Sequence, residues 1–278
     1  MPHYDFRTPR LYVDQGLAAG GAAALTKEQA HYLVDVMRMK VGDGVLAFNG
    51  RDGEWRCELA QLSKKLWALN ANELARGQTP PGDLHYLFAP LKRARLDYMV
   101  QKAVEMGATR LAPVLTQHTQ AERVNTERMR ANAIEAAEQC GILAIPEVVE
   151  PVALERAIAA LEPARLLVFC DEGAETSDPV RALAEYRETR TAGAPGSATE
   201  APRADHQGGK LLPILPVTVI AGVAVIVGPE GGFSEAERAM FLRRPNTVRI
   251  ALGPRILRAD TAAVAALAVV QAVLGDWR

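Results

Sequence analysis

Cysteines are few in this sequence, and their placement excludes two classes of site. Cys57, Cys140 and Cys170 are the three cysteines of the 278-residue chain, and they lie far apart. No CxxC pair or histidine cluster accompanies them, so the sequence has neither the ligand spacing of a metal site nor the even cysteine number of a disulfide framework. We therefore expect no bound metal and a reduced, cytoplasmic setting.

Long apolar runs are also missing. The first ten residues, MPHYDFRTPR, contain no apolar signal core, and the longest apolar stretch, 211–227, is interrupted by Pro213, Pro216 and Gly222. A helix that spans a membrane needs about 20 consecutive apolar residues. We therefore expect a soluble protein with no membrane partner.

Net charge is close to zero. The chain has 32 Lys and Arg against 33 Asp and Glu, a formal net charge of -1, so it lacks the global basicity of proteins that bind nucleic acid non-specifically. A polyanionic partner would have to meet a local basic patch. At 49% hydrophobic residues the chain is apolar enough to bury a full core, and its length is typical of two domains.

Residues 1–74 have the pattern of a small domain built mainly of strands. A helix is expected over residues 25–39, with Leu33, Val36 and Met37 on one face. The segment 75–83, ARGQTPPGD, is rich in Pro and Gly and ends this pattern, so we expect it to be the linker to a second domain.

Two strands of this first domain flank the turn residues NGRDG. In the second strand, apolar and charged residues alternate, which predicts that one face is buried and the other exposed. The apolar set is Trp55, Cys57 and Leu59, and the charged set is Glu54, Arg56 and Glu58.

Residues 84–278 alternate strand and helix, the pattern of a mostly parallel sheet covered by helices. Strands are expected at HYLFAPL, TRLAPVLT, EVVEP, ARLLVFC, VAVIVG and TVRIALG, and helices between and after them, the last from Asp260 to Leu274. The segment 186–210 interrupts this series because it is polar and rich in small residues. We expect it to be a mobile surface insertion.

The stretch VGPEGGFSEAER, 227–238, is the first of two loops that carry candidate chemistry. Gly228, Gly231 and Gly232 allow a tight turn and let a ligand approach the main chain without a Cβ in the way. The spacing matches neither G-x-G-x-x-G nor the P-loop, which suggests a ligand other than a phosphate. On this loop alone, a binding site and a plain connection both remain open.

A helix is predicted to start at the end of this loop. Ser234 and Glu237 have the spacing of a capping box, which fixes the helix start directly after the glycines. Glu230 has no cationic neighbour in sequence, so it either interacts with the helix dipole or contacts a ligand.

The second loop, LGPRILRADTAAVAAL at 252–267, has the same order of strand, Gly-Pro and helix. If the two loops face one another, they offer backbone groups and an apolar wall suited to an adenine. The wall would be formed by Leu252, Ile256 and Leu257. We also expect a local basic patch, because 238–258 contains six arginines and no acidic residue: Arg238, Arg243, Arg244, Arg249, Arg255 and Arg258.

The pair VGPEGGFSEAE and LGPRILRADTAAV, in this order near the C-terminus, closely resembles the RsmE family, the bacterial 16S ribosomal RNA N3-uridine methyltransferases. Supporting matches are LKRARLDYMVQKAVEMGATRLAPVLTQH, AIEAAEQCG and HYLVDVMRMKVGDGVLAFNG. The resemblance covers most of the chain except the insertion after Tyr186.

The resemblance implies a PUA-like, RNA-binding β-barrel at 1–74, then a SPOUT-type α/β domain at 84–278 in which the chain forms a deep trefoil knot. It also implies S-adenosyl-L-methionine as cofactor, held by the knot loops, and a homodimer with the knots at its interface. By position, the cofactor pocket would be lined by Phe169, Gly228, Gly231, Leu252, Gly253, Ile256, Leu257 and Arg258.

The implied reaction is methylation of a uridine N3 in 16S rRNA of the small ribosomal subunit. The imide proton must leave, and a cation near O2 or O4 would stabilise the negative charge, for which Arg258 is the first candidate. Glu230 and Asp260 are candidate bases, although each can instead cap its helix. The candidate RNA contacts are Arg38, Lys40, Lys64, Lys65, Lys92, Arg93, Arg95 and Arg255.

Two positions depart from the family pattern: Asp260 stands where Glu is usual, and Ile142 where Arg is usual. The first shortens a candidate carboxylate, and the second removes one expected RNA contact.

Two other functions remain open: a non-catalytic RNA-binding protein of ribosome assembly, and a SPOUT methyltransferase acting on another RNA. Loss of cofactor binding would favour the first, and a different methylated nucleoside the second.

Overall fold

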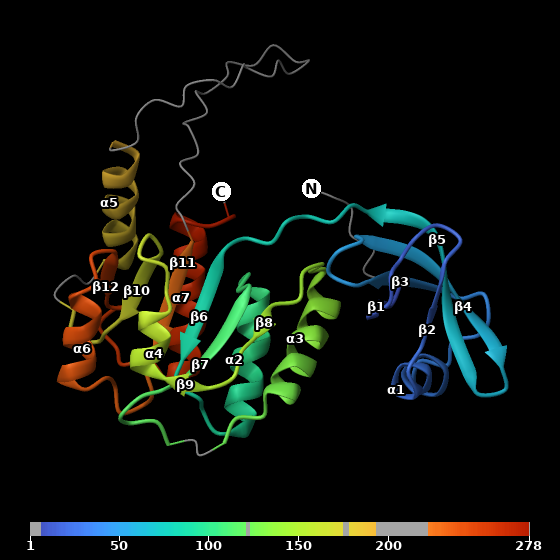
Figure 1. The fold of residues 1–278 in the computed structure, drawn as a ribbon, viewed down its shortest axis with the longest axis horizontal. Helices are drawn as coiled ribbons and strands as arrows, with labels where there is room; N and C mark the ends of the chain where they lie inside the picture. The colour runs from blue at the N-terminus through green and yellow to red at the C-terminus, as the bar shows by residue number, and fades with distance from the viewer. Residues whose placement is uncertain (1–6, 121–122, 175–177, 193–221, 278) are drawn as a thin grey trace, which may run out of the picture.

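The computed structural model describes residues 7–120, 123–174, 178–192 and 222–277 of the chain. Two sheets organise them, an N-terminal sheet and a larger C-terminal one (Figure 1). The part of the chain beyond Ala192 that was expected to be an insertion, 193–210, lies outside the described residues.

The first sheet has the strand order β1-β3-β4-β5-β2. Its pairs are antiparallel, except that β1 pairs in parallel with β3. The apolar side chains on its inner face, such as Val45, Cys57 and Leu59, form a core of their own. The strands are β1 (Arg10–Tyr12), β2 (Ala22–Ala24), β3 (Gly44–Phe48), β4 (Glu54–Ser63) and β5 (Leu66–Arg76).

The helix expected over 25–39 is shorter and partly of another type. Thr26 caps α1 (Lys27–Ala30), which continues as the π-helix η1 (His31–Val36). Leu33 is buried as predicted, but Val36 and Met37 are 59% and 41% exposed, so the predicted apolar face was wrong there. The reason is the i→i+5 hydrogen bonding of a π-helix, which rotates later side chains away from the face that an α-helix would present.

The alternation along β4 holds for Cys57 and Leu59, which are buried, and for Arg56 and Glu58, which are exposed. Glu54 contradicts it, because this carboxylate is only 3% exposed. The pairing of β4 with β5 shifts register between Glu54 and the next residue, and a β-bulge of this kind turns a side chain to the other face.

The second sheet has the order β12-β10-β11-β6-β7-β8, and β9 also pairs with β7. Every pair is parallel, which confirms the predicted parallel sheet. The strands are β6 (Leu84–Phe88), β7 (Arg110–Leu115), β8 (Glu147–Val148), β9 (Val152–Ala153), β10 (Leu166–Cys170), β11 (Val223–Val227) and β12 (Thr247–Ile250).

Helices cover both faces of this sheet (Figure 1). One apolar core joins the sheet to α2, α3, α5 and α7, and a second joins its other face to α4 and α6. Leu267 and Val270 of the last helix belong to the first core. The helices are α2 (Arg93–Glu105), α3 (Thr126–Cys140), α4 (Leu154–Ala159), α5 (Pro179–Ala192), α6 (Glu235–Leu242) and α7 (Ala259–Val273).

The insertion predicted over 186–210 was wrong at its start, because α5 runs to Ala192 and Tyr186 packs against the core.

The predicted linker 75–83 starts two residues too early, because β5 ends at Arg76 and β6 starts at Leu84. Domain boundaries at these positions stay a prediction, and so does the trefoil knot. Among the described helices, none is long and apolar enough to cross a membrane.

Candidate functional site

The loops that follow the parallel strands meet at the carboxyl edge of the second sheet, where open α/β sheets bind their ligands. The two glycine-containing loops follow β11 and β12, and β10 lies between these strands. The loop after β10, 171–174, therefore lies between the two predicted loops. In the sequence, this third loop is marked only by its place after an apolar strand.

The two predicted loops line one cavity of about 250 Å³. Most of the predicted cofactor residues contribute to it: Gly228, Gly231, Leu252, Gly253, Ile256 and Leu257. Glu230 and Arg255 line it as well, and the third loop adds Asp171 and Glu172. The convergence of the two loops, on which the functional hypothesis depends, is therefore present in the structure.

Two predicted residues do not line this cavity. Phe169 is completely buried, and its ring packs 4.6 Å from Phe241 and 5.4 Å from Phe233 between ring centroids. Its neighbour Cys170 lines the cavity instead, because successive strand residues point to opposite faces. Arg258 is the N-cap residue of α7 and is exposed, and within the described part of the chain its guanidinium has no bonding partner.

One glycine in each loop is required by the packing or the backbone conformation of that loop. A Cβ on Gly228 would lie 2.9 Å from the ring of Phe233, closer than carbon atoms approach one another, so the ring occupies the space that this glycine leaves. Gly253 has a φ of 92° with open space around it, so glycine is favoured there by its backbone conformation. The first glycine admits an aromatic side chain and the second permits the turn.

The predicted capping box is confirmed. The Ser234 hydroxyl accepts from the Glu237 amide, and the Glu237 carboxylate accepts from the Ser234 amide at 2.8 Å. The same buried carboxylate accepts from the amide of Gln117 at 2.8 Å. The helix start is thereby tied to the loop after β7 as well as to its own glycine loop.

Arg238 and Arg249 do not belong to a basic patch, because both bind Asp171. Arg238 Nη1 lies 2.5 Å from Asp171 Oδ1, and Arg249 Nε lies 2.7 Å from Oδ2. Arg238 also donates to the carbonyl of Phe233, and Arg249 to that of Gly173. This Asp171 cluster connects the loop after β10 to α6 and β12, the elements next to the two cavity loops.

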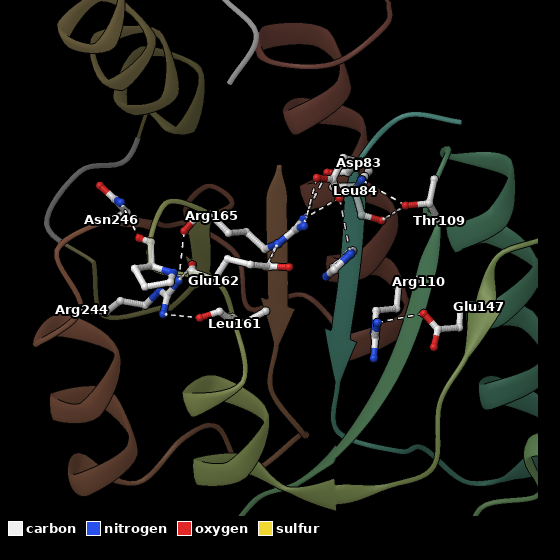
Figure 2. Close-up of polar contacts among 12 residues, drawn as sticks. Asp83, Leu84, Thr109, Arg110, Glu147, Leu161, Glu162, Arg165, Arg244 and Asn246 are labelled. Carbon is white, nitrogen blue, oxygen red and sulfur yellow. Dashed lines mark hydrogen bonds and ion pairs between the residues drawn. The ribbon is translucent and has the colours of Figure 1, made fainter. Parts of the chain in front are cut away.

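Arg244 is also used within the fold, at the opposite, amino edge of the sheet (Figure 2). Its guanidinium donates to the carbonyls of Leu161 and Glu162. Beside it, Arg165 holds Asp83 through two hydrogen bonds of 2.7 and 3.0 Å. The predicted basic patch was therefore wrong for Arg238, Arg244 and Arg249, because the sequence does not show which acceptors folding brings to each arginine.

A second cavity of about 360 Å³ adjoins the first and shares Pro229 and Glu230 with it. Lys92 and Arg95, at the start of α2, line this second cavity. Arg95 Nη1 lies 3.1 Å from Glu230 Oε1, and Arg95 Nε lies 4.0 Å from Asp260 Oδ2. The loop carboxylate that has no cation near it in sequence therefore has one in space.

The predicted RNA-binding residues fall into two groups. Lys92, Arg93 and Arg95 begin α2 at the carboxyl edge, and Arg255 lines the first cavity. The other group lies on the N-terminal barrel: Arg38 and Lys40 follow η1, and Lys64 and Lys65 form the turn between β4 and β5. All of these side chains are exposed except Arg95, which is partly buried by its carboxylate partners.

Comparison with known proteins identifies the family. The sequence profile described as an RNA methyltransferase domain matches residues 78–197 and 200–271, and one described as an RNA methyltransferase PUA domain matches residues 25–66. Two curated relatives share the name ribosomal RNA small subunit methyltransferase E. The Rickettsia conorii protein is 27% identical over 94% of both chains, and the Bacillus subtilis protein 26% identical over 89% of this chain and 88% of its own.

Solved structures agree with this assignment. A methyltransferase from Legionella pneumophila, in complex with S-adenosylmethionine, has a TM-score of 0.73 and 25% identity, covering 96% of this chain and 98% of its own. A ribosomal RNA small subunit methyltransferase E from Neisseria gonorrhoeae, also bound to S-adenosylmethionine, has a TM-score of 0.75 at 22% identity, with coverage of 98% and 100%, and shows the likeness of fold. Because the RNA methyltransferase profile matches most of its length, the chain belongs to the RNA methyltransferase family whose members carry a PUA domain, the RsmE family that the sequence resembles.

Proposed function

We propose that this protein transfers a methyl group from S-adenosyl-L-methionine to N3 of a uridine in the 16S rRNA of the small ribosomal subunit. The observation that carries the proposal is the pair of adjoining cavities at the carboxyl edge, which share Pro229 and Glu230. One cavity fits the methyl donor and the other a base. A shared wall between two sites is what a direct transfer between them requires.

The residues of the first cavity fit the cofactor. The glycine-containing loops expose main-chain groups beside the apolar side chains Val227, Leu252 and Leu257, a combination suited to an adenine ring. The cavity is close to the lower end of the roughly 300–1,000 Å³ of small-molecule sites. We assign the cofactor contacts to Gly228, Gly231, Leu252, Gly253, Ile256 and Leu257, with Arg258 at the rim, and Cys170 replaces Phe169 in this set. When bound, the cofactor supplies an electrophilic methyl group.

The chain's own groups supply orientation and charge. Glu230, at the junction of the cavities, is the candidate acceptor for the imide proton, and Arg95 orients its carboxylate through their ion pair. Arg258, whose guanidinium is not used within the described fold, is the candidate cation for the charge that develops on O2 or O4. Asp260 contacts Arg95 at 4.0 Å, so we assign it a supporting role.

We further infer that the enzyme is a homodimer in the cytoplasm with rRNA as its partner. Ile256, on the rim of the first cavity, is 90% exposed, and a second copy of the chain lying over the knot loops would remove this apolar side chain from water. All three cysteines are free, which fits a reducing compartment.

Nucleoside mass spectrometry of ribosomal RNA from a strain that lacks the gene tests the proposal directly. We expect N3-methyluridine to disappear from the small-subunit rRNA and to return with the wild-type gene. Loss of a different methylated nucleoside would assign the enzyme to another RNA. Calorimetry that shows no affinity of the purified protein for S-adenosylmethionine would instead favour a non-catalytic role in ribosome assembly.

A further inference from the structure

Two arginines of the N-terminal barrel bind the C-terminal end of α3. Arg10, the first residue of β1, donates from Nη1 to the main-chain carbonyl oxygens of Ala137 at 2.5 Å and Glu138 at 2.7 Å, near the end of the helix. Its Nη2 donates to the carbonyl oxygen of Ile142, just past the helix end, at 3.1 Å. Arg76, the last residue of β5, donates to the carbonyl oxygen of Gly141 at 2.9 Å. Positive charge at a helix C-terminus is favourable because the unpaired carbonyls there carry partial negative charge.

Glu54 joins these two arginines. Its Oε1 lies 2.7 Å from Arg10 Nε, and its Oε2 lies 2.7 Å from Arg76 Nε. This is the carboxylate that the bulge in β4 turns inward. Burial alone would raise the pKa of Glu54, but the hydrogen bonds from Arg76 and Arg10 outweigh burial and lower it, so the three residues form a charged unit, here named the barrel clamp.

Other contacts make the clamp part of a packed interface. The amide of Tyr12 donates to Glu138 Oε1 at 2.8 Å. Phe48, from β3 of the barrel, is completely buried in the core of the second sheet, and the Arg10 guanidinium lies 4.5 Å from the centroid of its ring. Gly141 ends α3 with a φ of 70°, and its carbonyl is the one that Arg76 binds.

The clamp lies at the amino edge of the second sheet, away from the cavities. α3 leads into β8, where Glu147 pairs with Arg110 at the start of β7, the pair shown in Figure 2. The barrel extends from this edge along α3, so that α1 and the turn between β4 and β5 lie toward the same end of the molecule as the carboxyl ends of the strands (Figure 1).

Because β5 is long, a small rotation of the barrel at the clamp would move the far end of this strand by several ångströms. Its 11 residues separate Arg76 from the turn that carries Lys64 and Lys65, a span of about 33 Å at roughly 3.3 Å per residue. A rotation of about 10° at the clamp would move these lysines by about 6 Å, which is more than the length of a charge-assisted hydrogen bond.

We propose that the barrel clamp is a positioning element that fixes the barrel relative to the cavities and thereby determines how strongly the enzyme binds its RNA. This inference rests on the proposed function. Because the clamp lies at the other edge of the sheet, it acts on RNA binding without touching the cofactor or the reacting base.

The test is Glu54→Gln, which keeps the size of the side chain and removes its charge. We expect the KM for small-subunit rRNA to rise about tenfold, which corresponds to a loss of about 1.4 kcal/mol of RNA binding, while kcat and the calorimetric affinity for S-adenosylmethionine stay at wild-type values. Small-angle X-ray scattering of the full-length variant should show a more extended particle. The matched control is Glu73→Gln, which removes an exposed carboxylate 3.9 Å from Arg56 on the same sheet and should leave all four quantities unchanged.

A folded Glu54→Gln variant with wild-type KM and scattering would overturn the proposal, and so would an equal loss of cofactor affinity, because that would indicate general destabilisation. If this variant does not fold, Arg76→Lys keeps the charge but loses the fork of donors and should raise KM in the same way. If the wild-type protein methylates no RNA, the proposed function fails, and the scattering comparison still decides whether the clamp holds the barrel.

Discussion

Asp171→Asn should lower both the stability of the protein and its affinity for the cofactor, because it removes a charge beside the cofactor cavity without changing the size of the side chain. The wild-type carboxylate is 1% exposed and accepts from Arg238 at 2.5 Å and from Arg249 at 2.7 Å. Asparagine has the same size, but its amide has only one acceptor oxygen and no charge. Two partly buried guanidinium groups would then lose their common counter-charge.

The expected loss of stability depends on how deeply the three charged side chains are buried. Removing one partner of a fully buried ion pair costs about 3–5 kcal/mol, but Arg238 and Arg249 are 20% and 30% exposed, so water offsets part of the loss and we expect about 2–3 kcal/mol. For a chain of this size that corresponds to a fall in Tm of roughly 5–10 °C. Because the cluster joins the loop after β10 to both neighbouring elements, we also expect the affinity for S-adenosylmethionine to fall about tenfold.

Calorimetry measures both quantities, as thermal unfolding of the free protein and as titration with the cofactor. Glu172→Gln is the matched control for stability, because Glu172 binds the same Arg238 at 3.2 Å but is 57% exposed and should contribute under about 1 kcal/mol. If the two variants unfold at the same temperature, the reasoning from burial is refuted.

Three further changes test other parts of the structure. Arg258→Ala should lower kcat about 100-fold with an unchanged Tm, measured on rRNA, whereas Arg243→Ala, which removes another exposed arginine, should leave turnover unchanged; full activity of the first variant would remove Arg258 from the mechanism. Gly228→Ala should reduce stability by about 1–3 kcal/mol because its Cβ would meet the Phe233 ring, and an unaltered unfolding curve would show that the ring has room to move. Since the pKa of Glu54 is lowered by folding, its stabilising contribution is present above the ordinary glutamate pKa of about 4.3 and is lost as pH falls through the lower folded value; thermal unfolding below pH 5 should therefore show a smaller loss of stability in Glu54→Gln than in the wild-type protein.

Local patterns were sufficient to predict most of the fold. The parallel strands and the capping box at Ser234 depend on burial and on hydrogen bonds within a few residues. These are properties that a short stretch of sequence carries. The order of strand, Gly-Pro and helix left open whether the two glycine-containing loops face one another, and the family resemblance implied that they hold one cofactor.

Features that depend on a distant partner could not be predicted in this way. Glu54 is the clearest case, because strand alternation places it in solvent and only Arg10 and Arg76, 44 and 22 residues away, explain its burial. Asp171 and the two arginines that it binds lie 67 and 78 residues apart. The prediction that Phe169 lines the cavity was wrong for a different reason. The strand β10 was predicted correctly, but the face of it that borders the cavity was not.

The pairing of arginines in space also bears on where RNA can bind. With a net charge of -1, the chain attracts a polyanion only where cations are left without internal acceptors. Of the six arginines in 238–258, Arg238, Arg244 and Arg249 are occupied by the fold, and Arg255 and Arg258 lie on the loop beside the first cavity. Arg255 and Arg258 are therefore available to RNA at the carboxyl edge, toward the same end of the molecule as the turn between β4 and β5 that carries Lys64 and Lys65. An RNA strand that contacts both would pass across the second cavity, which is where the proposed reaction needs its base.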